Sequence, residues 1–437
     1  MNLIVLAAGQ ASRLGPLAHP NKALVSLHGK PMIAHHAALA RELNANLVVI
    51  SAHPAVAYAA DQVGASVVPA ITNGPVESIA AGLTEGHTAV IAADTYLHPS
   101  EAHLLASPCA LVAPTPRTDR VFTCADWTDR NPTDEPVFIG ALAADAELLR
   151  KAANQSLPEP MGPFLSLLDL PTRTVETWQD VGDFTALAQA LRTPQPGRAD
   201  HQLSLTDDGY VHKTGVTSGE RAAAATFADL LPGIFPRVLP ADDGYYIEAV
   251  DAPTLAELSL YWDLTSDAWE AIAARIGRTL RTIWSTPHPD RRPLSNDWLY
   301  QKVHDRLGAC PAIPLNHTPT RTVVHGDPNL TNILYSPSLQ TVRLIDPRGN
   351  WNGEDTITGD PVYDLAKLRM SWANRFISIV HDMPHATIGG ADQLEAEAMR
   401  LADFLGVDVA TLDAMQTLIL LSAAPLHPQT DQLIEAA

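Results

Sequence analysis

The sequence predicts an α/β protein in two parts, a Rossmann-like sheet followed by a two-lobed α+β unit. Three observations lead to this expectation. Short apolar runs alternate with helical runs over residues 1–192, a Pro- and Gly-containing stretch interrupts the alternation, and hairpin signals followed by long helical runs occupy residues 200–437. Alternation of strands and helices is typical of a mainly parallel sheet covered by helices.

Composition indicates a folded chain of more than one domain. At about 100–200 residues per domain, the length predicts two or three domains. Hydrophobic residues make up 46% of the 437 residues and charged residues 18%, which predicts a large core. The formal net charge is −20 and no run of Lys and Arg stands out, so no nucleic-acid partner is expected. Three scattered cysteines favour neither a disulfide framework nor a cysteine metal site.

The sequence carries no signal for a membrane or for export. No apolar run reaches about 18 residues, the length that a membrane-spanning helix needs. The opening MNLIVLAAG is too short for the apolar region of a signal peptide. We therefore expect a cytoplasmic protein with no membrane partner, and the sequence does not indicate its oligomeric state.

The expected elements of the first part alternate in order. Strands are expected at 3–8, 46–52, 88–94, 109–116 and 136–143, and helices at 30–44 and 75–85. Ligands of such sheets bind beyond the carboxyl ends of the strands, where Gly9 and Asp94 fall. His35 and His36 are expected on a helix face rather than as a metal pair. Residues 193–199 are expected to form a linker.

The pattern of expected elements changes in the second part of the chain. Hairpins are expected at 203–213, around Asp-Asp-Gly, and at 237–250, with a helix at 220–231 between them. This predicts a small β lobe over about 200–250, followed by a helical lobe over about 254–437. A β-rich island at 321–346 interrupts the helical lobe. That order of elements is typical of a kinase-like fold.

The stretch HGDPNLTN, residues 325–332, suggests phosphoryl transfer. That chemistry uses a residue that orients the attacking hydroxyl, Mg²⁺ on the phosphates, and a cation. Asp327 is placed to accept a hydroxyl proton, and Asn332 can bind Mg²⁺ through its amide oxygen. The following strand, Ser-Pro turn and strand should return Asp346 close to Asn332 as a second metal ligand.

A phosphate cation is expected from the first hairpin. Lys213 ends that hairpin and can contact the nucleotide phosphates. Glu220 opens the following helix, and we expect it to hold Lys213 by an ion pair.

Three segments of the second part, VVHGDPNLTNIL, VRLIDPRG and GDPVYDLAKL, resemble the aminoglycoside phosphotransferase and choline kinase group. The resemblance covers roughly residues 200–437. It implies ATP as a substrate, Asp327 as the catalytic base, Asn332 and Asp346 as Mg²⁺ ligands, and Lys213 on the ATP phosphates. It also implies that His325, Asp360 and Asp364 support the catalytic loop. The sequence departs from many relatives in the DPRG segment.

The stretch LAAGQASRLG follows the first strand and suggests a phosphate-binding loop. Ala7, Ala8 and Gly9 have almost no side chain, so their backbone N–H groups can approach phosphates closely. Arg13 adds a fork-shaped donor, and Lys22 adds a second cation. The loop is neither a P-loop nor a GxGxxG motif.

This run resembles MobA-like and sugar-phosphate nucleotidyltransferases, whose sheet is of the GT-A-like type. Their signature is a strand, then LAAGxxSRLG, then a PKAL-like segment and GKP. The resemblance covers about residues 1–190 and implies that Gly9, Arg13 and Lys22 contact the triphosphate, with Lys22 as a catalytic residue. Asn21 stands where the usual residue before the lysine is Pro.

Further residues carry over from the same resemblance. TNGPVESIAAGL matches the segment that meets the nucleotide base, which implies Asn73 and Ser78. IAAD matches the strand that ends in a metal-binding carboxylate, Asp94, and WQDVGDF gives Asp180 as the second, with Asp183 as the fallback. Asp180 can alternatively be a helix-capping carboxylate. The base-binding segment resembles the cytidylyltransferase branch, notably its choline-phosphate type, which favours CTP.

Two such sites in one chain suggest two reactions in series. A kinase would phosphorylate a hydroxyl of a small metabolite, and a nucleotidyltransferase would then join the phosphorylated product to a nucleotide with Mg²⁺, ATP and CTP or another NTP. One alternative is a sugar anomeric kinase fused to a sugar-1-phosphate uridylyltransferase. Another is a nucleotide-binding regulatory protein with inactive sites, against which the retained lysines and carboxylates argue.

Overall fold

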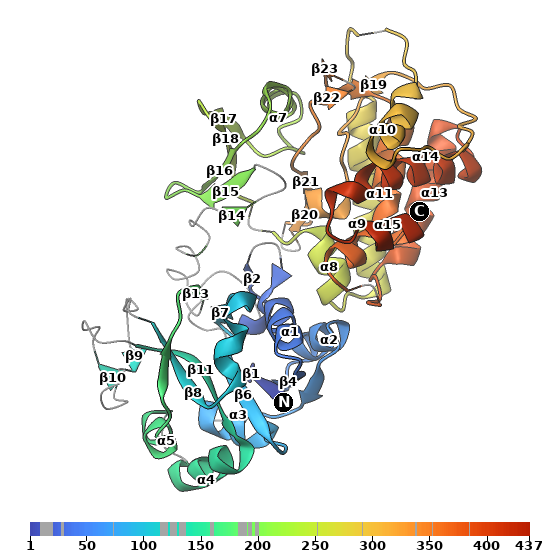
Figure 1. The fold of residues 1–437 in the computed structure, drawn as a ribbon. Coiled ribbons are helices and arrows are strands. Elements are labelled where there is room, and N and C mark those ends of the chain that lie inside the picture. The colour runs from blue at the N-terminus through green and yellow to red at the C-terminus, as the bar shows by residue number, and fades with distance from the viewer. Residues whose placement is uncertain are drawn as a thin grey trace. The chain divides into compact units, whose positions relative to one another are not determined.

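In the computed structural model the chain divides into two compact units, Met1–Thr193 and Pro194–Ala437 (Figure 1). Each unit has its own sheet and its own core and is described by itself. The structure describes residues 1–8, 21–27, 30–72, 74–113, 121–122, 129–130, 137–157, 161–181, 190, 195–196, 201–250, 252–290, 292–336, 339–351, 353–383 and 385–437.

The N-terminal unit is built on a seven-stranded sheet. β11 runs antiparallel to both of its neighbours, and the other six strands run parallel to one another. This confirms the expected mixed α/β class with a mainly parallel sheet. In spatial order the strands are β12 (Thr172–Thr174), β8 (Cys109–Ala113), β11 (Val137–Asp145), β6 (His87–Ala92), β1 (Asn2–Leu6), β4 (Asn46–Ile50) and β5 (Ser66–Val68).

Helices cover the sheet because its central strands are apolar on both faces. Ile4 on β1 and Ile50 on β4 pack in one cluster with residues of α3, α4 and α5. α1 contacts β1 and β4 as well as the 3₁₀ helix η3. Within the described residues, the helices of this unit are η2 (Lys22–Leu24), α1 (Met32–Glu42), α2 (Pro54–Gln62), α3 (Pro75–Gly82), η3 (Pro99–Ala106), α4 (Ala146–Ser156) and α5 (Met161–Leu168).

A small antiparallel pair lies next to the carboxyl end of β6. β7 (Thr95–Leu97) follows β6 after a tight turn and pairs with β13 (Trp178–Asp180), so that Thr95 lies opposite Asp180. The sequence pattern does not predict this strand pair. The remaining two-stranded sheets are β2 (Ser26–Leu27) with β3 (Lys30–Pro31) and β9 (Val121–Phe122) with β10 (Asp129–Arg130).

The C-terminal unit opens with a five-stranded antiparallel sheet. Both predicted hairpins are present, since Leu205 pairs with Val211 and Val238 pairs with Ile247. The helix α7 (Ser218–Leu230) joins them, as the sequence predicts. In spatial order the strands are β14 (Gln195–Pro196), β15 (Gln202–Leu205), β16 (Tyr210–Thr214), β18 (Gly244–Glu248) and β17 (Val238–Pro240).

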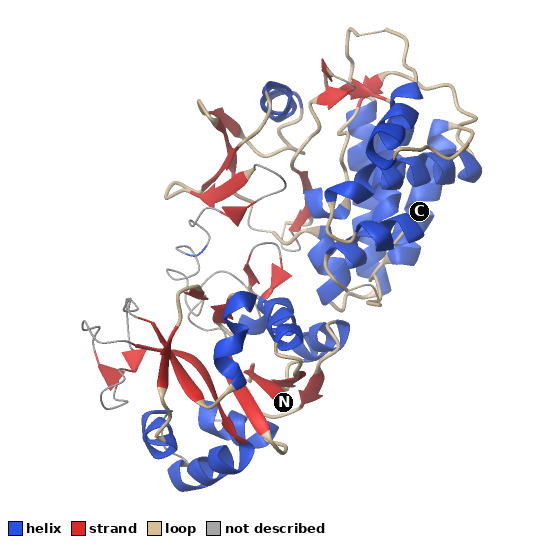
Figure 2. Ribbon diagram, in the orientation of Figure 1, coloured by secondary structure: helices blue, strands red, loops and turns tan. Residues whose placement is uncertain are grey.

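The rest of this unit is mainly helical (Figure 2). α11 lies at its centre, where it packs against α12, α13 and α14 and is buried along most of its length. The helices are α8 (Leu255–Tyr261), α9 (Ser266–Trp284), α10 (Asp297–Leu307), α11 (Pro361–Ala373), α12 (Phe376–Val380), α13 (Ala391–Leu405), α14 (Val409–Ala423), η5 (Ala424–Leu426) and α15 (Thr430–Glu435).

One segment, Val409–Leu426, is long and apolar enough by length and composition to cross a membrane. Of that segment, 61% is buried inside the protein. Its helix α14 packs against α10 and α11, which is the environment of a core helix.

The predicted β-rich island forms several short pairs within the helical part. β19 (Thr322–Val323) pairs with β24 (Thr358–Gly359), and β20 (Ile333–Ser336) forms a hairpin with β21 (Thr341–Leu344). β22 (Asn350–Trp351) pairs with β23 (Glu354–Asp355). The loop from His325 to Asn332, which ends in the 3₁₀ helix η4 (Leu330–Asn332), therefore lies between two anchored strands.

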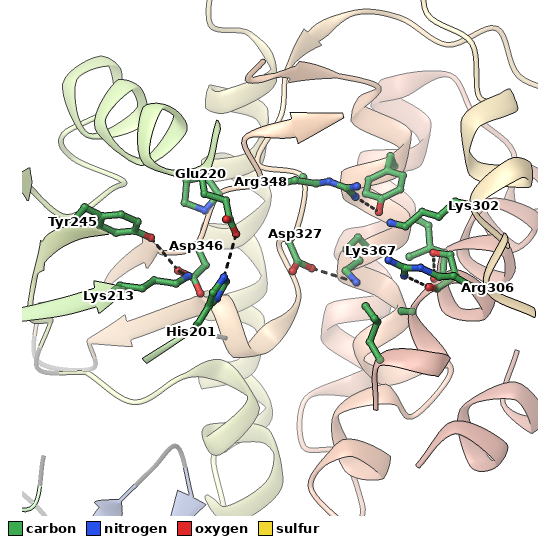
Figure 3. A pocket seen from close by; sticks show the side chains of 17 residues that line it. His201, Lys213, Glu220, Tyr245, Lys302, Arg306, Asp327, Asp346, Arg348 and Lys367 are labelled. Carbon is green, nitrogen blue, oxygen red and sulfur yellow. Dashed lines mark hydrogen bonds and ion pairs between the residues drawn. The ribbon is translucent and has the colours of Figure 1, made fainter. Parts of the chain in front are cut away.

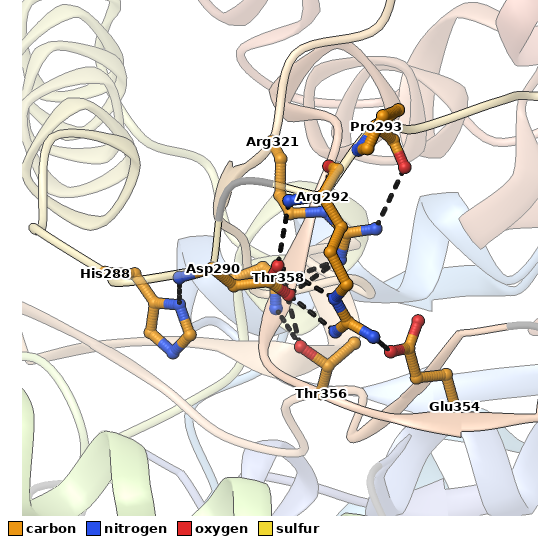
Figure 4. Close-up of polar contacts among 8 residues, drawn as sticks. All are labelled: His288, Asp290, Arg292, Pro293, Arg321, Glu354, Thr356 and Thr358. Atoms are coloured by element: carbon orange, nitrogen blue, oxygen red, sulfur yellow. Dashed lines mark hydrogen bonds and ion pairs between the residues drawn. The ribbon is translucent and has the colours of Figure 1, made fainter.

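A polar network fixes the first of these strands (Figure 4). Asp290 accepts hydrogen bonds from Arg292 at 2.7 and 2.9 Å, from Arg321 at 3.1 Å and from Thr358 at 3.2 Å. The bonds from Arg292 hold the pKa of the Asp290 carboxyl well below its usual range. Because Arg321 adjoins β19 and Thr358 lies on β24, the network ties the segment before α10 to the strand that leads into the loop.

Candidate functional sites

In the N-terminal unit, Lys22 and Asp94 form a close ion pair. Lys22 Nζ lies 2.5 Å from Asp94 Oδ2, and the two side chains are 14% and 13% exposed. Asn21 caps η2 by accepting from the Ala23 N–H at 2.9 Å, and its amide donates to the carbonyl of Ala7 at 2.7 Å. Asn21 stands where the nucleotidyltransferases that this segment resembles usually have Pro. Its amide joins η2, which begins at Lys22, to the end of β1.

The pairing of β7 with β13 brings the backbones of the two predicted metal ligands, Asp94 and Asp180, to neighbouring positions. Asp180 lies opposite Thr95, the residue after Asp94. In addition, the Val181 N–H donates to the backbone carbonyl of Asp94 at 2.9 Å. Asp94 directly precedes β7 and Asp180 ends β13, so the backbones of these two residues lie side by side at the carboxyl end of β6, the expected edge of the sheet.

A buried histidine supports this edge. The ring of His36 is fully buried, and its Nε2 lies 3.0 Å from the carbonyl of Thr95. Burial lowers its pKa to about 4. The neutral ring then donates from Nε2, the only arrangement that satisfies a carbonyl. His35 likewise contacts the carbonyl of Leu27 at 2.7 Å, so both histidines hold backbone and are not a metal pair.

The remaining predicted residues of this site are only partly described. Ala7 is buried and Ala8 half-buried directly after β1. Ser78, on the first turn of α3, donates to the carbonyl of Gly74 at 3.1 Å and lies 2.5 Å from the Thr72 hydroxyl. Ser78 therefore contacts both Thr72 and Gly74 at the start of α3. The predictions for Gly9, Arg13, Asn73 and Asp183 lie outside the described residues.

In the C-terminal unit, His325 organises the candidate catalytic loop. Its ring is buried, its Nε2 contacts the carbonyl of Ile345 at 3.0 Å, and its Nδ1 accepts from the Asp327 N–H at 3.2 Å. Burial lowers its pKa to about 4. A neutral ring with these two bonds orients the loop, which agrees with the predicted role.

Asp364 on α11 holds the backbone of the same loop. Its carboxylate accepts from the N–H groups of His325 at 2.8 Å and Gly326 at 2.6 Å, and from the indole of Trp284 at 3.1 Å. Burial raises its pKa to about 7, against the effect of the N–H donors. Gly326 has a φ of +85°, and a Cβ there would lie 2.6 Å from Cβ of Arg348, which explains why the residue before Asp327 is glycine.

Asp327 lies near the start of the loop and Asn332 at its end, and a hydrogen bond joins the two residues. The amide of Asn332 donates to the backbone carbonyl of Asp327 at 2.9 Å. The carboxylate of Asp327 accepts from Asn329 at 3.0 Å and lies 3.2 Å from Nζ of Lys367. Asp327 therefore faces the cavity with a fixed orientation and a cation beside it.

The hairpin returns Asp346 to the loop as the sequence predicts. The N–H of Ile345 donates to the carbonyl of Asn332 at 3.0 Å, which places Asp346 next to Asn332. Asp346 has a φ of +57°, an uncommon conformation for a residue other than glycine. Such backbone strain is found preferentially at functional sites. Its Oδ1 lies 2.6 Å from Nζ of Lys213.

The predicted ion pair between Lys213 and Glu220 is wrong. Lys213 pairs with Asp346, while Glu220 Oε2 accepts from the N–H and the hydroxyl of Thr217 at 2.8 and 2.9 Å. The first of these bonds, together with the bond from the Glu220 N–H to the Thr217 hydroxyl at 3.2 Å, forms a capping box at the start of α7, a local arrangement that competes for the carboxylate. Glu220 still lines the same cavity, and its Oε1 lies 3.9 Å from His201.

A cavity of about 270 Å³ joins the residues of this site. It is lined by Lys213, Glu220, Asp327 and Asp346, which the sequence predicts as site residues, together with a group of cations that the sequence does not predict there (Figure 3). The missed cations are Lys302, Arg306, Arg348 and Lys367. A signal for three of them was present in the sequence. Lys302 and Arg306 are four residues apart on one helix, and Arg348 belongs to the divergent DPRG segment.

The donor groups at both sites fit a hard divalent cation such as Mg²⁺. Asp346 and Asn332 offer a carboxylate and an amide oxygen, and Asp94 and Asp180 offer two carboxylates. Mg²⁺ is commonly held by one or two carboxylates together with substrate phosphates. Among the described residues, no group of three or more His, Cys, Asp and Glu side chains suggests a metal held by protein ligands alone.

Residues 3–161 match the family model described as "MobA-like NTP transferase domain". The N-terminal unit therefore contains a nucleotidyltransferase domain, as the sequence predicts, and the protein is in this part a transferase. The match does not extend into the C-terminal unit, whose kinase-like assignment stays a prediction. No curated protein matches the chain.

Three solved structures similar to this chain belong to sugar-nucleotide enzymes. One, described as a glucose-1-phosphate thymidylyltransferase from Bacillus anthracis in complex with sucrose, is 18% identical, with 44% of this chain and 93% of that chain covered and a TM-score of 0.35. A nucleoside-diphosphate-sugar pyrophosphorylase from Vibrio cholerae RC9 is 14% identical, with 44% and 100% covered and a TM-score of 0.35. A UDP-glucose pyrophosphorylase complexed with UDP-glucose is 13% identical, with 43% and 96% covered and a TM-score of 0.37.

Proposed function

We propose that this protein is a bifunctional enzyme that phosphorylates a small metabolite and then activates the product with a nucleotide. The C-terminal unit transfers the γ-phosphate of ATP to a hydroxyl of the metabolite. The N-terminal unit joins the resulting phosphate monoester to the nucleotidyl group of CTP and releases pyrophosphate. The product is a nucleoside-diphosphate-linked metabolite, a form in which cells supply building blocks for glycans, lipids or surface polymers.

One observation carries the kinase half of the proposal. A single loop and the hairpin after it bring Asp327, Asn332 and Asp346 together, with Lys213 on Asp346. These residues supply a proton acceptor, two oxygen ligands for Mg²⁺ and a phosphate cation, which are the parts that phosphoryl transfer uses. His325 and Asp364 are buried behind the loop and fix its backbone, so the reacting groups are held in place before substrate binds.

The chemistry of the kinase site follows from these positions. The acceptor hydroxyl lies at Asp327, its oxygen attacks the γ-phosphorus of ATP, and its proton passes to the Asp327 carboxylate. The bond from that phosphorus to the bridging oxygen breaks, and ADP leaves. Lys213 offsets charge on the ATP phosphates. Mg²⁺, held by Asn332 and Asp346 when bound, would neutralise further phosphate charge.

The nucleotidyltransferase half rests on the family match and on the pair of Lys22 with Asp94. A phosphate oxygen of the monoester attacks the α-phosphorus of the nucleotide, and the bond to the pyrophosphate group breaks. Lys22 offsets the negative charge that gathers on the phosphates during this step. Asp94 and Asp180 would hold Mg²⁺, which would polarise the α-phosphate. The resemblance of the segment around Ser78 to the cytidylyltransferase branch supports CTP.

The proposal is tested by following both products with the full-length protein. Mg-ATP and a panel of hydroxyl compounds should release ADP, and addition of CTP should then release pyrophosphate. An Asp327→Ala variant should lose ADP release by about 100-fold to 10,000-fold, the range for removal of a general base, and keep nucleotidyl transfer to a supplied phosphate monoester.

Two outcomes would contradict the proposal. If a folded Asp327→Ala variant also loses nucleotidyl transfer, the two activities do not occupy separate sites. If UTP or another NTP replaces CTP with a higher kcat/KM in the same assay, the choice of CTP is wrong and the uridylyltransferase alternative gains support.

A further inference from the structure

The cavity of the C-terminal unit has two halves of different charge, with Asp327 between them (Figure 3). On one side, Lys213 and His201 are accompanied by the carboxylates of Asp346 and Glu220. On the other side the lining is cationic and comes from α10, α11 and the residue pair after Asp346. This second lining, the cationic half, consists of Lys302, Arg306, Arg348 and Lys367.

The cations of this half are only partly balanced within the protein. Lys367 pairs with Asp327 at 3.2 Å. Arg348 donates to the Tyr363 hydroxyl at 3.0 Å and the Asn350 carbonyl at 2.8 Å, which are neutral acceptors. No carboxylate of the described residues lies within ion-pair distance of Lys302. Arg306 donates to the backbone carbonyl of Ser422, and Asp327 is the carboxylate beside this half through its pair with Lys367.

The pKa of Lys302 reflects its burial and the closeness of the other cations. Burial lowers its pKa to about 6, and the charges of Arg348, Arg306 and Lys367 act in the same direction. Its Nζ lies 5.6 Å from the centre of the Trp298 ring, a contact worth little beside the repulsion of like charges. Holding these cations together costs stability, and on a chain of net charge −20 they contrast with the rest of the protein. An anionic ligand would relieve that cost.

We propose that the metabolite phosphorylated here is an anion, a small hydroxyl compound whose carboxylate, phosphate or phosphonate group binds to Lys302 and Arg306. This inference rests on the proposed kinase activity and names the substrate class of the same site. Bound in this way, the anionic group lies in the cationic half and the hydroxyl lies toward Asp327. Arg348 and Lys367 complete the positive surroundings of the ligand.

The same geometry argues against amino alcohols as acceptors. An ammonium group would meet the cations Arg306, Arg348 and Lys367 and would disfavour protonation of Lys302, whereas a bound anion would favour it. The carboxylate beside this half is Asp327, which the reaction needs for the hydroxyl. The rest of this lining includes Ile419, Ala423 and Leu426, which suit a short carbon skeleton. With about 270 Å³ for the whole cavity, the acceptor is small.

The first test compares acceptors of matched size and different charge. ADP release is measured with full-length protein, Mg-ATP and one acceptor at a time. The first two pairs compare glycerate with glyceramide and glucuronate with glucose. The other two compare glycerol phosphate with glycerol and hydroxyethylphosphonate with ethanolamine. We expect an anionic member to exceed its neutral partner in kcat/KM by about tenfold or more, since charge-assisted hydrogen bonds discriminate by this amount. A neutral or cationic compound used as well as or better than every anion would overturn the inference and leave the kinase proposal standing.

Site variants give the second test. With the best anionic acceptor, Lys302→Met should raise the acceptor KM by about tenfold or more and change the ATP KM by about twofold at most. Lys302→Arg should restore most of the affinity, and Arg278→Met, an exposed cation on α9, is the matched control. Equal effects of Lys302→Met on the KM of ATP and of acceptor would place this lysine on the nucleotide and contradict the inference.

A binding measurement separates failure of the inference from failure of the kinase proposal. Calorimetry with the same compounds and a non-hydrolysable Mg-ATP analogue should show anion binding that Lys302→Met weakens. If anions bind in this way but none of the panel yields ADP, the anion site stands and the kinase proposal is wrong. If no anion binds more tightly than its neutral partner, the inference is wrong.

Discussion

The two candidate sites of this chain are built in the same way from unrelated elements. Each has a lysine paired with a carboxylate, Lys22 with Asp94 at 2.5 Å and Lys213 with Asp346 at 2.6 Å. In each, a fully buried histidine contacts a backbone carbonyl next to that carboxylate, Thr95 in one and Ile345 in the other.

The sites differ in what surrounds this common core. In the N-terminal unit Lys22 comes from η2, Asp94 directly precedes β7 and Asp180 ends β13. In the C-terminal unit the reacting groups share one loop and hairpin, and the cationic half comes from α10 and α11, distant in sequence. On the proposed function, the nucleotide phosphates would meet a similar lysine–carboxylate pair in both units, whereas the groups proposed to bind the second substrate differ.

The largest effect is expected from a variant that tests whether the lysine–carboxylate pair of the N-terminal unit is catalytic. Lys22→Met should reduce nucleotidyl transfer by about 100-fold to 1,000-fold, the range for losing one donor that stabilises transition-state charge. ADP release by the C-terminal unit should be unchanged. Pyrophosphate release measures the first activity, and Lys151→Met, an exposed cation on α4, is the control. Pyrophosphate release near the wild-type rate would show that Lys22 only holds Asp94 in place.

The next test concerns the rigidity of the loop in the C-terminal unit. Asp364→Ala removes an acceptor of three buried hydrogen bonds and should destabilise this unit by about 3 kcal/mol or more. Asp364→Asn keeps one acceptor oxygen and should lose less. Hydrogen exchange of residues 322–346, with the β1 to β6 strands as internal reference, measures the change. Equal loss of protection in both units would contradict a local role.

The buried histidines predict a shared pH dependence. The folded pKa of His36 and of His325 is lowered to about 4 from an ordinary value of 6.5, so the unfolded chain binds more protons between these values. The stability that the neutral rings provide is complete above about pH 6.5 and is lost as the pH falls toward 4. Thermal midpoints measured across this range should fall with pH. His36→Gln, which keeps an N–H donor without titrating, should flatten the dependence for the N-terminal unit alone, and an unchanged slope would argue against this cause.

The smallest expected effect concerns the cap of the lysine turn. Asn21→Ala removes the cap of η2 and the bond to the Ala7 carbonyl, and should cost about 1 kcal/mol of stability. The KM for the nucleotide should rise modestly because Lys22 is less well placed. Asn46→Ala, an exposed residue at the start of β4, is a control for loss of an amide. A larger loss of activity than Lys22→Met causes would mean that Asn21 has a direct role.

Much of this organisation follows from local sequence. The strand and helix alternation, both hairpins of the C-terminal unit, and the return of Asp346 to Asn332 depend on short-range patterns and turns, and the sequence predicts them. The partner of Lys213 does not follow in this way. Glu220 is committed to the capping box of α7, and the carboxylate that contacts Lys213 lies 133 residues further along the chain.

The features that the sequence missed arise from packing between distant segments. The pair of β7 and β13 consists of two three-residue strands with no alternation long enough to detect. The cationic half gathers side chains from α10, α11 and the DPRG segment, which meet only when the helices pack. Spacing within each segment gives no sign of that meeting, so the charge of the acceptor is an inference from the structure.

The central claim is that two independent sites act in series, and a complementation assay tests it most directly. Asp327→Ala should stop ADP release only, and Asp94→Ala should stop nucleotidyl transfer only. Each variant alone then fails to make the nucleotide-linked product from ATP, CTP and acceptor, whereas an equimolar mixture of the two makes it. A folded variant that loses both activities, or a mixture that makes no product, would contradict the account.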